Sequence, residues 1–133
     1  MERGSRARRK SSARAALVSA SLLAVSAAVV SAEDIPAPAK QEAETVWQTR
    51  CSTCHGAQGK GDGAAAAALT PKPRDFTSAA WQATVTDERI EKIIAEGGQS
   101  VGLSPLMIAN PDLVSKPDVI KALRAHVRSL VAK

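Results

Sequence analysis

Apolar and polar residues alternate with a helical period in three stretches of the chain. In the first stretch, residues 41–54, one face of the helix carries Ala43, Val46, Trp47, Cys51 and Cys54. In the last stretch, which opens with the capping-box match of residues 115–118, one face carries Ile120, Leu123, Val127 and Leu130. Both patterns predict amphipathic helices that bury one face.

The middle stretch has clear start and stop signals. Thr86 can cap a helix N-terminus, and the acidic residues Asp87 and Glu88 suit the positive end of the helix dipole. An apolar stripe of three isoleucines follows, and Gly97 and Gly98 stop the helix.

The remaining segments predict loops. Four glycines in residues 56–63 break the first helix, one or two helical turns fit residues 64–69, and Pro71 and Pro73 fix an extended path. No stretch predicts a strand, and no segment is repeated. The expected fold is therefore all-α, with about four helices and long connecting loops.

Charge is concentrated at the N-terminus. The chain has 18 basic and 13 acidic residues, but residues 1–32 hold six of the basic residues and one of the acidic ones. Residues 33–133 therefore carry 12 of each and are formally neutral. The net positive charge does not indicate a nucleic-acid partner, because it belongs to the leader.

Residues 1–32 have the three parts of a secretory signal peptide. A basic stretch ends at Arg14, an apolar stretch begins at Ala15, and residues 30–32 place small side chains before the expected cleavage after Ala32. We expect export to the periplasm of a bacterium. The alternative is an uncleaved anchor facing the same compartment, because the apolar stretch approaches the roughly 20 residues that span a bilayer.

The mature chain is long enough for one domain. Residues 33–40, with Pro36 and Pro38, are expected to form an extended linker, and residues 41–133 the domain. The aromatic residues of this part are Trp47, Phe76 and Trp81. So small a core needs a further apolar component, which a buried cofactor would supply.

The segment Cys51-Ser-Thr-Cys54-His55 supplies the candidate chemistry. Two thiols one helical turn apart, followed by an imidazole, suit the covalent attachment of one haem c, with His55 as an iron ligand. A disulfide redox motif would belong beside a βαβ pattern, which is missing from this sequence. A structural zinc site needs four ligands, and the chain has two cysteines and two histidines.

Met107 is the expected sixth ligand of the iron. It is the only methionine after the leader, and it lies in a loop rich in Gly and Pro rather than on a helical stripe. His126 is the alternative ligand, but its place within the last helix favours packing or solvent contact. A backbone carbonyl is expected to orient the imidazole of His55, with Pro71 the first choice and Pro73 the second.

These motifs resemble the class I cytochrome c family, specifically its small bacterial single-haem members. The resemblance rests on Trp47, the Cys51–Gly56 motif, the glycine loop, residues 71–76, the segment from Gly97 to Met107, and residues 127–130. It implies Cys51 and Cys54 as thioether attachments, His55 as proximal ligand and Met107 as distal ligand. It also implies that the first and last helices cross.

Two positions depart from the family pattern. Ile108 follows Met107 where the family often has proline. Without that proline, the methionine loop is expected to be less rigid. His126 stands where the family often has tyrosine, which predicts a weaker aromatic contact between the terminal helices.

The resemblance implies an electron carrier rather than an enzyme. Filled axial positions leave no room for substrate at the iron. The expected partners are redox proteins that dock transiently at the haem edge, steered by Lys60, Lys72 and Arg74, and the carrier is expected to be a monomer. The alternatives are a gas-binding or peroxidatic protein with a labile methionine, and a haem subunit of a larger oxidoreductase.

Overall fold

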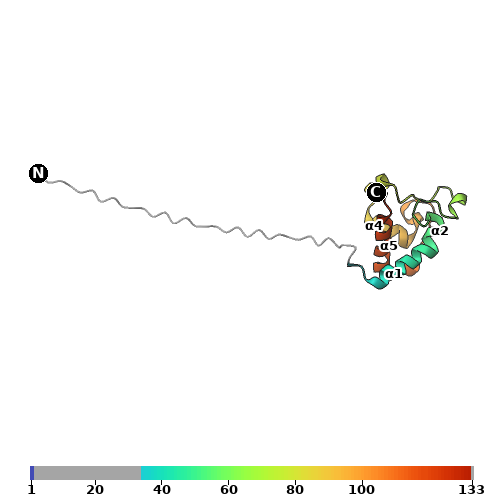
Figure 1. The fold of residues 1–133 in the computed structure, drawn as a ribbon, viewed down its shortest axis with the longest axis horizontal. Coiled ribbons are helices and arrows are strands. Elements are labelled where there is room, and N and C mark those ends of the chain that lie inside the picture. Colours follow the sequence, from blue (N-terminus) through green and yellow to red (C-terminus); the bar gives the residue numbers. More distant parts are fainter. Residues whose placement is uncertain (2–33, 133) are drawn as a thin grey trace.

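The structure, a computed structural model, describes residues 1 and 34–132 (Figure 1). Its elements in chain order are α1 (Ala37–Val46), a π-helical turn (Trp47–Cys51), α2 (Ser52–His55), a 3₁₀ turn (Ala66–Ala68), α3 (Ala79–Thr84), α4 (Asp87–Glu96), two further 3₁₀ turns (Gly98–Val101 and Pro111–Leu113) and α5 (Pro117–Ser129). No strand occurs in this part of the chain. The prediction of an all-α fold is confirmed.

Helix α1 begins earlier than expected. The extended linker predicted for residues 33–40 is wrong from Ala37 onward, because the helix starts there with Pro38 in its first turn. Proline is tolerated in a first turn, where the backbone N–H has no helical partner. Ile35 is also buried in the core, so these residues belong to the domain. The predicted signal peptide and its cleavage position lie outside the described residues.

One helical segment runs from α1 through the π-helical turn into α2 and carries both cysteines near its end, as predicted. It ends at Gly56, which has φ +80° and donates its N–H to the carbonyl of Ser52. A residue with a side chain rarely adopts this φ. The wider turn at Trp47–Cys51 ends at the first cysteine, and such π turns are frequent at functional sites.

The predicted start of α4 is confirmed, and that of α5 is not. The Thr86 hydroxyl accepts a hydrogen bond from the N–H of Arg89, and α4 ends before Gly97. Helix α5 begins at Pro117 after Lys116, with no side-chain cap, so the capping box expected from Ser115 does not form. Proline fixes its own φ and excludes the helical conformation from the residue before it, which places the boundary between these two residues.

Helix α5 lies at the centre of the core, with α1 and α4 packed against it (Figure 1). Leu113 and Leu123 are fully buried, and Trp47 belongs to the same apolar cluster as Leu123 and Val127. The packing of the first helical segment on the last helix is therefore confirmed. The short helix α3 was not predicted, because none of its residues is buried and it has no apolar stripe.

Candidate haem site

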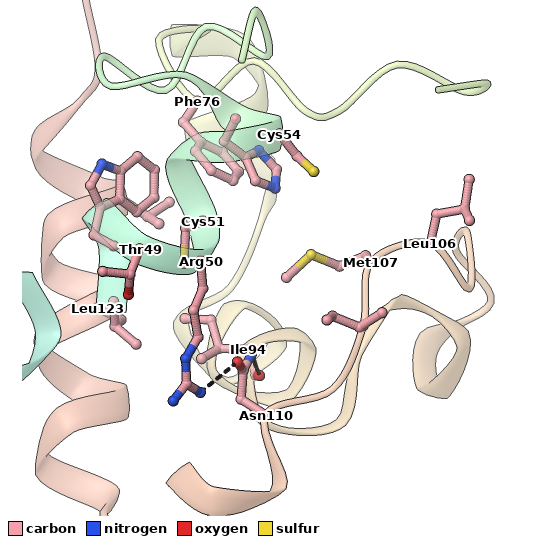
Figure 2. A pocket seen from close by; sticks show the side chains of 14 residues that line it. Thr49, Arg50, Cys51, Cys54, Phe76, Ile94, Leu106, Met107, Asn110 and Leu123 are labelled. Carbon is pink, nitrogen blue, oxygen red and sulfur yellow. Dashed lines mark hydrogen bonds between the residues drawn. The ribbon is translucent and has the colours of Figure 1, made fainter. Parts of the chain in front are cut away.

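An apolar cavity of about 360 Å³ lies between the end of the first helical segment and the loop of residues 102–110. Cys51, Cys54, His55 and Met107 all line it. Figure 2 shows the Met107 side chain entering the cavity from its loop, with Cys51 and Cys54 projecting from the helix on the other side. The fold therefore brings together the four residues that were predicted from two distant parts of the sequence.

His55 is buried, and its ring is held by a backbone carbonyl. Its Nδ1 lies 3.2 Å from the carbonyl oxygen of Arg74. A carbonyl can only accept, so Nδ1 carries the proton and Nε2 keeps its lone pair. Burial lowers the pKa of the imidazole, and the hydrogen bond to Arg74 opposes this shift. The neutral ring is the form that binds a metal.

The prediction that Pro71, or else Pro73, supplies this carbonyl is wrong. The Pro73 carbonyl lies beside Gly61, where a Cβ would come within 2.5 Å of its oxygen. Successive residues of an extended segment face opposite sides, so the next carbonyl, that of Arg74, is the one directed at His55.

Aromatic packing fixes the plane of the His55 ring. Phe76 stacks on it, with ring centroids 4.5 Å apart and an interplanar angle of 18°. Trp47 lies beside both rings, at centroid distances of 6.5 Å from His55 and 6.2 Å from Phe76. Phe76 was not predicted as a site residue, because it lies in a loop without periodicity. Two signals could have singled it out, the scarcity of aromatic residues and the family resemblance of residues 71–76.

The two thiols are free, and the environment of Cys51 keeps its sulfur neutral. Burial raises the pKa of Cys51 to about 11, while the nearby Arg50 lowers it and Cys54 raises it further. Thiol–disulfide exchange needs the thiolate, so this environment is unfavourable for a redox disulfide. Within residues 34–132, no group of three or more His, Cys, Asp or Glu side chains is arranged to hold a metal ion.

The backbone holds Met107 next to the end of α4. Its carbonyl accepts a hydrogen bond of 2.8 Å from the N–H of Gly98, and its own N–H donates to the carbonyl of Ser104 at 3.2 Å. A Cβ at position 98 would collide with the Ser104 carbonyl, so the close approach requires glycine.

A cavity with two free thiols, an imidazole with a free lone pair and a thioether on its walls fits a covalently bound haem. The family model described as Cytochrome c matches residues 41–130. The chain belongs to the cytochrome c family. Its cofactor is a covalently attached haem c, for which Cys51 and Cys54 have the required spacing. When bound, haem supplies a one-electron couple between Fe(III) and Fe(II).

A solved structure supports the same assignment. This cytochrome is similar to the c-type cytochrome KustC0563, with 32% sequence identity and a TM-score of 0.52. The match covers 66% of this chain and 95% of the other one. Comparison with curated protein sequences finds no match.

His126 of this cytochrome does not line the haem cavity. It lines a separate cleft with Glu44 and Trp47, and its ring centroid lies 4.3 Å from that of Trp47. The terminal helices are therefore joined by an aromatic contact, in which the imidazole of His126 meets the indole of Trp47. The alternative of His126 as an iron ligand has no support in this geometry.

Proposed function

We propose that this cytochrome is a one-electron carrier whose haem iron is ligated by His55 and Met107. The observation that carries the proposal is that the imidazole and the thioether line the same cavity from different segments of the chain. Cys51 and Cys54 would hold the porphyrin through thioether bonds. The carbonyl of Arg74 would keep the lone pair of His55 available to the iron.

This ligand set favours electron transfer over catalysis. With His55 and Met107 both bound, no axial position is left for a substrate. A methionine ligand raises the reduction potential relative to harder donors, and a buried site disfavours the additional positive charge of Fe(III). The apolar walls of the cavity, including Ile94, Leu123 and Val127, would exclude water from the haem. These features indicate a carrier that accepts electrons readily.

We propose that redox proteins dock at the mouth of this cavity. Leu106 and Ile108 line the cavity and are 55% and 72% exposed, so they offer an apolar contact there. Lys60 and Arg74 are exposed on neighbouring loops and can steer an acidic partner. Lys72 differs from them, because its ammonium group donates to the carbonyls of Ala66 and Ala67.

We place the carrier in the periplasm, because its first 32 residues have the parts of a signal peptide. No helix in residues 34–132 is long and apolar enough to cross a membrane. An uncleaved leader would instead tether the domain to the membrane, as expected for a haem subunit of a larger oxidoreductase.

The spectrum of the reduced holoprotein with and without carbon monoxide tests the proposal. We expect a low-spin c-haem spectrum that the gas does not change, because Met107 occupies the sixth position. Met107→Ala should bind the gas readily and lower the reduction potential. Binding by the wild type would instead indicate a labile methionine and a gas-binding or peroxidatic role, for which the exposed Ile108 after Met107 is the supporting observation.

A further inference from the structure

We propose that Asn110 is a positioning residue that holds Met107 at the iron, and that Arg50 ties its side chain to the helix bearing Cys51. The inference rests on the proposed His55/Met107 ligation and extends it to two residues that supply no ligand. It identifies what replaces the rigidity that a proline after Met107 would provide.

Side-chain packing does little to hold the methionine loop. Leu103, Leu106 and Ile108 are 49%, 55% and 72% exposed, so most of their apolar surface contributes no burial energy. The loop also begins with Gly102, whose backbone is less restricted than that of other residues. The loop must therefore be held by its polar contacts.

Asn110 supplies two of these contacts. It is 9% exposed, whereas its neighbours Ala109 and Pro111 are exposed. Its side-chain amide donates to the carbonyl of Ile94 at 2.8 Å, and its backbone N–H donates to the carbonyl of Ala95 at 3.0 Å. Both carbonyls belong to the last turn of α4, where helical partners are missing. Asn110 thus fastens the loop to α4 three residues after Met107.

Arg50 completes the link from the other side of the cavity. Its Nη1 donates to Oδ1 of Asn110 at 3.3 Å, as Figure 2 shows, and its guanidinium makes two hydrogen bonds of 2.9 Å to Asp112. Because Arg50 directly precedes Cys51, it connects the haem-attachment helix to the methionine loop. The ion pair of Arg50 with Asp112 is about half exposed. We therefore expect it to contribute less to holding the methionine loop than the Asn110 side chain does.

Loss of the side-chain hydrogen bonds of Asn110 should let the loop open more often and expose the sixth position of the iron. Free imidazole captures the open state, so its affinity for the ferric holoprotein measures the opening equilibrium. We expect Asn110→Ala to raise this affinity about 10-fold, the scale of one lost buried hydrogen bond. Asp112→Asn should raise it by a factor of about 3 or less, because the pair is exposed.

The experiment is a visible-spectroscopy titration of each ferric holoprotein with imidazole. Lys121→Gln is the matched control, because it removes another half-exposed ion pair, with Asp118, away from the cavity and should leave the affinity unchanged. Thermal unfolding of each variant identifies any general loss of structure. If Asn110→Ala does not accumulate, Asn110→Ser, with a shorter polar side chain, is judged by the same criterion.

The outcomes separate the two proposals. A wild-type protein without the sulfur-to-iron charge-transfer absorption would overturn the ligation by Met107. A wild-type protein that has this absorption, with Asn110 variants that bind imidazole no more tightly, would overturn the positioning role alone. An equal increase in Lys121→Gln would also overturn it, because the effect would then be unrelated to the loop.

Discussion

The imidazole ring of His126 packs against the indole ring of Trp47, with the ring centroids 4.3 Å apart. This contact joins α5 to the π-helical turn after α1. Trp47 is 4% exposed and also lines the haem cavity, so His126 supports the cavity wall from behind without reaching the cavity itself. A titratable side chain therefore stabilises the junction of the terminal helices.

The contact predicts a pH-dependent stability. Burial lowers the pKa of His126, and the carboxylate of Glu44, 4.0 Å away, opposes this shift. The unfolded chain, with a histidine pKa of about 6.5, takes up this proton first as the pH falls. The free energy of unfolding should therefore decrease below about pH 6.5, and it should decrease less in His126→Phe.

Guanidinium unfolding of the holoproteins at about pH 7.5 and about pH 5 measures this difference. The other titratable groups also change their proton binding on unfolding. Their contribution is the same in both proteins and cancels in the comparison. Glu44→Gln removes the opposing carboxylate and should make the loss at low pH larger than in the wild type. Equal losses in the wild type and His126→Phe would show that this histidine does not contribute.

The stacking of Phe76 on His55 predicts a loss of stability when the ring is removed. Phe76 also contacts Trp47 and Trp81, so Phe76→Ala leaves a gap among three rings. We expect the free energy of unfolding to fall by about 3 kcal/mol, the lower end of the range for such truncations because the residue is only partly buried. Phe76→Leu should cost about 1.5 kcal/mol or less. Chemical denaturation of the holoproteins tests both values, and equal stability of the two variants would contradict the stacking role.

The positions of the basic side chains predict that charge reversal at Lys60 and Arg74 slows electron transfer more than charge reversal elsewhere on the surface. Oxidation of the reduced protein by the ferricyanide anion should slow about 10-fold at low salt in the double variant Lys60→Glu and Arg74→Glu. The difference should shrink as salt is added. The Arg74 substitution leaves its carbonyl, and hence the His55 contact, in place.

Lys92→Glu on α4 is the control for this prediction and should change the rate much less, since Lys92 is paired with Glu96 and lies outside the cavity. Stopped-flow rates at several salt concentrations give the comparison. If the double variant and the control show the same rate and the same salt dependence, steering by Lys60 and Arg74 does not occur.

Local patterns in the sequence predicted the parts of the fold that depend on near neighbours. Thr86 caps α4 and Gly97 ends it, and the buried stripe of α5 includes Leu123 and Val127 as expected. The spacing of apolar residues along a helix and the capping residues at its ends depend only on residues close together in the sequence. They can therefore be recognised without knowledge of tertiary contacts. The segment from Cys51 to His55 indicated haem attachment for the same reason, because its chemistry is contained within five consecutive residues.

What the sequence by itself determined is therefore the cofactor class, the main helices and four residues that line the candidate haem cavity. Only the tertiary structure decided that Arg74 rather than Pro71 supplies the carbonyl to His55, that His126 meets Trp47, and that Asn110 reaches α4. The direction of a carbonyl in a loop and the partner of a buried amide depend on how segments far apart in the chain pack together. No local period or cap carries that information.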